Sequence, residues 1–308
     1  MTPPRRRTVL VFAGVDPSGG AGIGADLHSI AALGAHALTV VTALTVQDHQ
    51  RAYAVQPVAP DFVQQQAQAL IASIAIDAVK IGIPGSAANA RAIARIITAL
   101  RARQPTLPVV LDPVLASGHG DTLSVDDAVA ALAPLLPLVT LLTPNGPEAQ
   151  ALSARYRRAA SAAAPAADAH AAPVADAHAA PAADAHAGAA GGMQVPAADA
   201  APAVAALAAA LQDAGCQHVL LTGGHGDGPE VINHWFGPGA GATGGRRWHW
   251  PRLPGTYHGS GCTLAAACAA LLAQQRPLAA ALEQAQAYCH ATLRAAYAIG
   301  PGQRIPCR

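Results

Sequence analysis

The 308-residue sequence carries little charge and contains only one lysine. Asp, Glu, Lys and Arg together make up 12% of the chain, the formal net charge is +1, and Lys80 is the single lysine. The one dense basic run lies at residues 5–7. Binding to nucleic acid requires Lys and Arg clustered over one face. We therefore expect no nucleic-acid partner.

Long hydrophobic runs and paired cysteines are also missing. The apolar run at residues 9–15 is short for a signal peptide, and Asp16-Pro17 follows it instead of a small-residue cleavage site. Residues 27–47 lack Asp, Glu, Lys and Arg, but their spacing changes from helical to β-branched midway. The five cysteines form no CxxC pair, which predicts neither a disulfide framework nor a structural zinc site. We expect a cytoplasmic protein without a membrane segment.

Segments with strand and helix patterns alternate along the chain. Apolar, β-branched runs predict buried strands at residues 8–15, 38–45, 78–81, 109–112, 139–143 and 218–222. Helical spacing of apolar residues predicts helices at residues 21–32, 61–73, 87–101, 125–136, 204–214, 263–273 and 278–297. A hairpin is predicted from residues 231–236 and 246–250. This order predicts an α/β fold with a central, mostly parallel sheet and helices on both faces, and places ligands at the carboxyl ends of the strands.

A repeat segment interrupts this alternation at about residues 153–202. PAADAHA, PVADAHA and PAADAHA begin at Pro165, Pro173 and Pro181, a strict period of eight residues. Regular prolines prevent one long helix, and the composition predicts a disordered insertion inside a single domain of residues 1–308. An alternative is a noncatalytic metal-binding protein that uses the Asp-x-His pairs of the repeats.

The first strand is followed by a glycine-rich turn at residues 16–26. Glycines allow a ligand to approach the backbone closely, and the helix that follows offers unpaired N–H groups. Gly20-x-Gly22-x-x-Ala25, with Asp48 further on, resembles a dinucleotide fingerprint and keeps a nicotinamide-dependent oxidoreductase open as an alternative. Such a fingerprint starts where the strand ends, whereas residues 16–18 intervene here.

A second glycine-rich turn, HGSGCT at residues 258–263, opens an Ala-rich helix. Gly259, Ser260 and Gly261 would expose successive backbone N–H groups at the helix N-terminus, forming an anion hole. Cys262 would lie in the first helical turn, where the helix dipole favours a thiolate. We therefore expect Cys262 to act as a nucleophile or base in acyl or phosphoryl transfer.

Two further strand ends carry acidic or amide side chains. Asp112 directly follows one buried strand, and Asn145 and Glu148 follow the next. Oxygen ligands at the edge of a sheet suit the Mg²⁺ that accompanies a nucleoside triphosphate. Alone, either motif would be read as a helix N-cap.

In this order, the motifs resemble those of hydroxymethylpyrimidine kinases of the ribokinase superfamily. The resemblance runs from about residue 9 to residue 297, outside the repeats, and rests on AGVDPSGGAGIGAD, VTALTVQ, KIG, VVLDPV, TPNGPEA, TGGH and HGSGCT. It implies a three-layer ribokinase-like fold. It also implies an ATP- and Mg²⁺-dependent kinase that phosphorylates 4-amino-5-hydroxymethyl-2-methylpyrimidine, and its monophosphate, for thiamin synthesis. A pyridoxal kinase is the nearest alternative, and a homodimer is common in the family.

The resemblance also implies a role for individual residues. The pyrimidine pocket would be lined by Gly14, Asp16, Gln47 and Val114. Mg²⁺ and the ATP phosphates would lie near Asp112, Glu148, Asn145, Thr222 and Gly224. The transferred phosphoryl group would lie in the turn of Gly259, Ser260, Gly261 and Cys262, with Cys262 taking the hydroxyl proton. Thr222 is a departure, because many members have Lys there, and a hydroxyl cannot offset phosphate charge.

Overall fold

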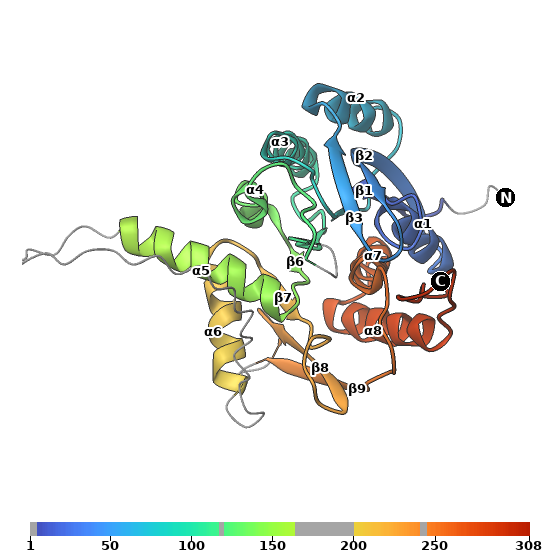
Figure 1. The fold of residues 1–308 in the computed structure, drawn as a ribbon. Helices are drawn as coiled ribbons and strands as arrows, with labels where there is room; N and C mark the ends of the chain where they lie inside the picture. Colours follow the sequence, from blue (N-terminus) through green and yellow to red (C-terminus); the bar gives the residue numbers. More distant parts are fainter. Residues whose placement is uncertain (1–4, 117–119, 164–199, 241–244) are drawn as a thin grey trace, which may run out of the picture.

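The structure, a computed structural model, describes residues 5–116, 120–163, 200–240 and 245–308. Strands and helices alternate over most of these residues (Figure 1). In chain order they are β1 Thr8–Val15, α1 Gly22–Ala32, β2 His36–Gln47, β3 Ala52–Pro57, α2 Pro60–Ile71, β4 Ala78–Ile81, α3 Ala87–Arg103, β5 Val109–Leu111, α4 Ala128–Ala131, the 3₁₀ turn Leu136–Leu138, β6 Leu141–Leu142, α5 Gly146–Ala163, α6 Ala200–Asp213, β7 His218–Leu221, β8 Glu230–Phe236, β9 Arg246–Pro251, α7 Ser260–Ala273 and α8 Leu278–Arg294.

All the strands belong to one nine-stranded sheet in the order β3-β2-β1-β4-β5-β6-β7-β8-β9. The six central strands, in the order β2, β1, β4, β5, β6 and β7, pair in parallel. The strands at the edges, β3 on one side and β8 and β9 on the other, pair antiparallel. The predicted mostly parallel sheet and the predicted hairpin are confirmed.

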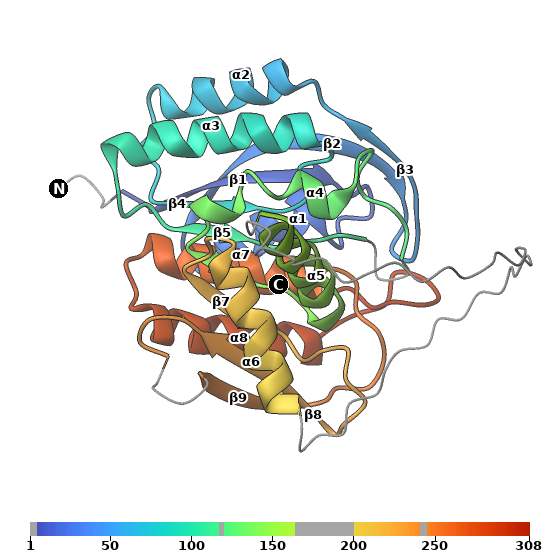
Figure 2. The same ribbon diagram turned by 90° about the vertical axis from the view of Figure 1, so that its left-hand side faces the viewer.

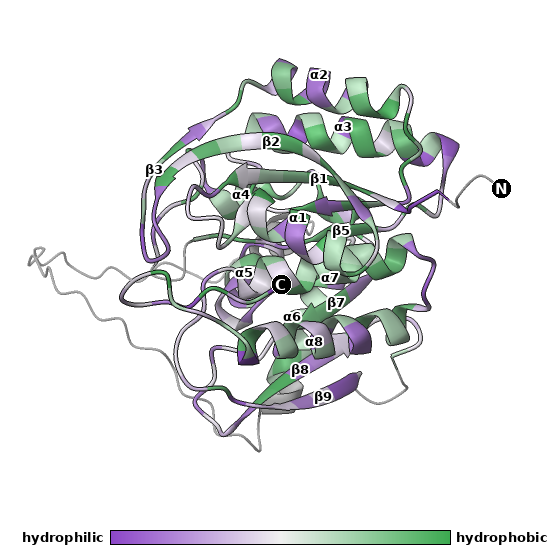
Figure 3. Ribbon diagram, turned by 90° about the vertical axis from the view of Figure 1, so that its right-hand side faces the viewer, coloured by the Kyte–Doolittle hydropathy of each residue, from purple (hydrophilic) through white to green (hydrophobic). Residues whose placement is uncertain are grey.

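The central strand β1 shows why helices cover both faces. Its side chains alternate, so that Leu10 and Phe12 belong to the core cluster on the side of α2, α3, α5 and α6, whereas Val9 and Val11 belong to the cluster on the side of α1, α7 and α8. Neither face is exposed to water, which is why the strand is apolar throughout. The result is three layers (Figure 2). The outer helices α2 and α3 alternate hydrophobic and hydrophilic residues along their length, as expected for helices with one buried face (Figure 3).

Two predictions about the elements were wrong, and one strand was not predicted. The helix predicted over 125–136 contains only Ala128–Ala131, because Pro134 and Pro137 cannot donate backbone hydrogen bonds and end it. Strand β3 was not predicted. The break predicted at about residue 153 was also wrong, because α5 continues to Ala163 and keeps Leu152 and Ser153 buried.

The three repeats and the disorder predicted for them lie outside the described residues. Across the ranges that the structure describes, no helix is both long and apolar enough to span a membrane. All five cysteines are free, in line with the absence of a predicted disulfide framework.

Candidate active site

A cavity of about 890 Å³ lies at the carboxyl ends of the parallel strands. Every residue to which the kinase resemblance gives a role lines this one cavity, although the residues come from loops far apart in the chain: Gly14, Asp16, Gln47, Asp112, Val114, Asn145, Glu148, Thr222, Gly224, Gly259, Ser260, Gly261 and Cys262. The parallel sheet explains this convergence, because its strands all end at the same edge.

The N-terminus of α7 forms one wall of the cavity. Gly259 is its N-cap and has a φ of 81°, a left-handed conformation that favours glycine. A Cβ at Gly259 would also collide with the carbonyl oxygen of Gly20, so the two glycine-rich turns touch backbone to backbone. The first N–H groups of the helix have no acceptor within it and can bind an anion.

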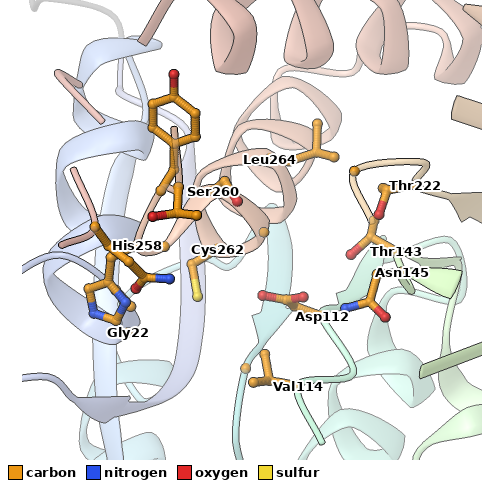
Figure 4. Close-up of a pocket in the computed structure, with 18 of the residues that line it drawn as sticks. Gly22, Asp112, Val114, Thr143, Asn145, Thr222, His258, Ser260, Cys262 and Leu264 are labelled. Atoms are coloured by element: carbon orange, nitrogen blue, oxygen red, sulfur yellow. The ribbon is translucent and has the colours of Figure 1, made fainter. Parts of the chain in front are cut away.

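Cys262 and Asp112 face each other beside this helix end (Figure 4). The Asp112 carboxyl and the backbone N–H of Gly22 set the electrostatic environment of the Cys262 thiol. Burial, together with the charges of Asp112 and Asp26, raises the pKa of Cys262 to about 12. This direction opposes the thiolate expected from the helix N-terminus, because burial disfavours the charged form of the thiol.

Lys80 and Asp26 form an ion pair behind Cys262, with 2.9 Å between Nζ and Oδ2 and no exposure of either side chain. Burial raises the pKa of Asp26 to about 6 despite the lysine. Burial alone would lower the pKa of Lys80, but the charges of Asp26, Cys262 and Asp112 raise it above its usual value. Sequence reasoning did not place this pair in the site. The sequence offered one sign of this pair, which is a lysine inside the otherwise apolar strand AVKI.

Asp16 lies in the cavity wall but its carboxylate is already bonded. It accepts hydrogen bonds from the backbone N–H groups of Ser18 and Ala21 and from the Ser18 hydroxyl, and lies 2.7 Å from Nε2 of His258. Burial would raise the pKa of Asp16, but the hydrogen bonds from His258 and Ser18 lower it to about 2. Asp16 thus joins the first glycine-rich turn to the second.

A second acidic group lies where α5 begins. The Asn145 side chain accepts from the Glu148 N–H and the Glu148 carboxylate accepts from the Asn145 N–H, each at 2.9 Å, which is a reciprocal helix cap. Burial and the nearby charge of Asp112 raise the pKa of Glu148 to about 8. Oδ2 of Asp112 is buried and has no hydrogen-bond partner among the described residues. These two carboxyl groups leave oxygen lone pairs available to a cation.

The loops after β6 and β7 form the side of the cavity that contains Thr222. Asn145 and Thr222 are paired as neighbours, and the Thr222 hydroxyl lies 3.4 Å from the Pro144 carbonyl oxygen. Arg252, which sequence reasoning missed, donates hydrogen bonds to the carbonyl groups of Gly224 and Gly228 and fixes this loop. No spacing in the sequence connects Arg252 with the loop.

The opposite side of the cavity is made by the ends of β1, β2 and β5. A register shift between Ala13 and Gly14 turns the end of β1, and a Cβ at Gly14 would clash with Ile83. Gln47 is the last residue of β2 and is half-buried, and Val114 follows β5. This arrangement leaves room for a small ring between apolar side chains and one carboxamide.

Known proteins with similar sequences point to the same family as these motifs. The family model described as phosphomethylpyrimidine kinase matches residues 16–177 and 191–307. A hydroxymethylpyrimidine/phosphomethylpyrimidine kinase of Salmonella typhimurium is 32% identical over 303 residues, which cover 98% of this chain and 96% of that protein. A thiamine biosynthesis multifunctional protein of Corynebacterium efficiens is 32% identical over 298 residues, but this chain spans only 34% of its length.

A solved structure supports the fold. The pyridoxal kinase from Staphylococcus aureus in complex with AMP-PCP and pyridoxal matches with a TM-score of 0.73 and 23% identity, covering 99% of this chain and 94% of that chain. At this identity the likeness shows the fold alone, which confirms the ribokinase-like three-layer architecture. The family match leaves no support for an oxidoreductase.

Proposed function

The chain belongs to the phosphomethylpyrimidine kinase family and is a phosphotransferase, and on that premise we propose its reaction. It transfers the γ-phosphoryl group of ATP to the hydroxymethyl oxygen of 4-amino-5-hydroxymethyl-2-methylpyrimidine, and then phosphorylates the resulting monophosphate. The observation that carries this proposal is the position of Cys262 and Asp112 beside the N-terminus of α7, inside one cavity.

The two substrates would enter from opposite sides of that helix end. The pyrimidine would lie among Gly14, Asp16, Gln47 and Val114, and the nucleotide would extend toward Asn145, Thr222 and Gly224. The hydroxyl oxygen would then attack the γ-phosphorus in line with the leaving oxygen of ADP. The N–H groups of residues 259–262 would stabilise the charge on the transferred group, which is the main contribution that a protein makes to phosphoryl transfer.

The hydroxyl proton requires an acceptor, and a neutral thiol cannot be one by itself. We propose a relay in which the substrate hydroxyl gives its proton to the Cys262 sulfur while the thiol proton passes to Asp112. The position of the Asp112 carboxyl beside the Cys262 thiol supports this path. In a loose transition state the substrate hydroxyl loses its proton late, after the bond to the leaving ADP oxygen has largely broken. Cys262 therefore need not be a thiolate before the reaction starts.

The residues present fit a Mg²⁺ ion that arrives with ATP. Asp112 Oδ2 is buried without a partner among the described residues, and the buried carboxyl of Glu148 lies within electrostatic range of it. No cluster of three or more His, Cys, Asp or Glu side chains able to hold a metal occurs in the described part of the chain. Asp112 and Glu148 would therefore hold the ion together with phosphate oxygens and water, as Mg²⁺ prefers. When bound, Mg²⁺ would offset negative charge on the phosphates.

An ATP-coupled assay with three acceptor compounds side by side tests the proposal. With ATP and Mg²⁺, we expect turnover of the hydroxymethylpyrimidine and of its monophosphate, and product masses higher by one phosphoryl group at each step. Pyridoxal serves as the matched control, since it carries a similar hydroxymethyl group on a similar ring. Turnover of pyridoxal alone would refute the proposed substrate, and no turnover of any acceptor compound would refute the proposed reaction.

A further inference from the structure

Behind the anion hole, carbonyl oxygens of both glycine-rich turns accept hydrogen bonds from the same side chain, Arg308. The guanidinium of Arg308 donates through Nη2 to the carbonyl oxygens of Gly20 at 2.6 Å and of Gly259 at 3.3 Å. Its Nε donates to the hydroxyl of Thr263 at 2.8 Å. That hydroxyl donates in turn to the Gly259 carbonyl at 2.8 Å. One side chain therefore bridges both turns and the first turn of α7.

Backbone pairing brings Arg308 to this place. Tyr297 and Ile305 form an antiparallel bridge, and Tyr257 and Arg304 a parallel one. Arg304 also forms backbone hydrogen bonds with residue 256, just before the HGSGCT turn, and with residue 258, the first residue of that turn. The segment of residues 304–308 therefore runs beside the turn that it contacts, and its register fixes where the guanidinium lies.

The two sides of the turns have different partners. The carbonyl groups of Gly20 and Gly259 point to Arg308. The same two peptide units carry the N–H of Ala21, which donates to Asp16 Oδ2 at 2.7 Å, and the N–H of Ser260, the first residue of α7. A peptide unit that rotates to free its carbonyl from Arg308 also turns its N–H. The orientation of the anion-binding N–H groups is therefore coupled to the guanidinium behind them.

Arginine suits this task better than lysine. Its planar guanidinium offers several N–H donors in a fixed fork, so it can hold three acceptors at once, and it remains charged. Lysine presents a single ammonium on a flexible stem. A permanent positive charge behind the turns also favours an anion in front of them.

We propose that Arg308 is a positioning residue of the anion hole, which keeps the N–H groups of residues 259–262 aligned with the phosphoryl group. The kinetic part of this proposal rests on the proposed function, but the alignment itself does not. Arg308 touches neither substrate in this account. Its effect is transmitted through Gly20, Gly259 and Thr263.

The test compares Arg308→Met and Arg308→Lys with Arg304→Met, a matched control from the same segment whose side chain is exposed. We expect Arg308→Met to lower kcat by roughly 10–100-fold, because small misplacements of catalytic groups have effects of this size. The KM for the pyrimidine should change by less than about twofold, because the pyrimidine pocket is untouched. Arg308→Lys should recover only a small part of kcat, and Arg304→Met should resemble the wild type.

Amide hydrogen exchange gives a second readout that needs no enzymatic activity. In Arg308→Met, exchange should accelerate in the peptides that cover residues 14–24 and 256–264, and stay unchanged elsewhere. If the wild-type protein had no kinase activity, the proposed function would be refuted. The comparison of hydrogen exchange between the wild type and Arg308→Met would still test the positioning role of Arg308. Unchanged exchange in those peptides, full recovery by Arg308→Lys, or faster exchange throughout the chain would overturn the proposal.

Discussion

Lys80 and Asp26 form the one ion pair of the described residues in which both side chains are fully buried. Lys80→Met would leave the Asp26 carboxyl without its counter-charge in the core. We expect the free energy of unfolding to fall by about 3–5 kcal/mol, the usual loss when one partner of a buried pair is removed. Chemical denaturation measures this change.

Two further variants test that explanation. Adding Asp26→Leu to Lys80→Met should recover much of the stability, because an apolar pair can replace a buried ion pair. Arg155→Met removes one partner of the exposed pair Arg155–Asp127 and should have little effect. Equal losses for Lys80→Met and Arg155→Met would show that the buried pair has no special role.

Gln47 tests the pyrimidine pocket. A carboxamide supplies one donor and one acceptor, which complement the ring nitrogen and amino group of an aminopyrimidine. Gln47→Leu should therefore weaken pyrimidine binding by about 1–3 kcal/mol and leave ATP binding nearly unchanged. Titration calorimetry with each ligand measures both, and Gln104→Leu, at the exposed end of α3, is the control. Equal losses for pyrimidine and ATP would argue against this role for Gln47.

Single residues also show how far the sequence predicts the site. Asp112 and Glu148 could be found because each follows a recognisable strand, and Gly259 and Cys262 because they lie in a glycine-rich turn that opens an Ala-rich helix. The pKa of Cys262 could not be predicted, because it depends on burial beside Asp112 rather than on its position in a helix. Arg308 could not be found either, since nothing in its spacing relates it to Gly20, 288 residues away in the chain.

At the scale of elements, continuous apolar strands were predictable and marginal ones were not. The strands β1 and β4 are buried on both faces, and their composition reflects this. In contrast, no residue of β3 is buried, and the strand ends in Pro57. Its existence depends on pairing with β2 at the edge of the sheet. Such tertiary support leaves little trace in local sequence.

Removal of residues 164–199 tests the insertion between α5 and α6. The repeats contain only Ala, Asp, His, Pro and Val, and offer little for a core, so we predict that they add little to stability or activity. Joining the helices by a short Gly-Ser linker should shift Tm by less than about 4 °C, since loop length affects stability weakly. The kcat should also be retained. A collapse of Tm, or loss of Mg²⁺-dependent activity, would show that the segment supports the site.

For the whole molecule, we predict a homodimer. Large apolar side chains are exposed where β2 and β3 form the edge of the sheet, with Leu44 at 51%, Val46 at 62% and Tyr53 at 66%. Exposed large apolar side chains at the edge of a sheet favour association. Light scattering coupled to gel filtration should give twice the chain mass of 30.8 kDa. Val46→Asp should shift the protein toward the monomer, and a wild-type monomer at micromolar concentration would contradict the prediction.

The central claim is that the cavity at the end of α7 transfers a phosphoryl group with the help of Cys262. Transfer of radiolabelled phosphate from ATP to the hydroxymethylpyrimidine tests it most directly, in Cys262→Ala and in Cys268→Ala, a buried cysteine of the same helix. We predict that Cys262→Ala folds normally and loses roughly 10²–10⁴ in kcat, as expected when an acid–base group is removed. Cys268→Ala should stay near the wild-type rate. A Cys262→Ala protein that turns over the pyrimidine at a near-normal rate would contradict the account.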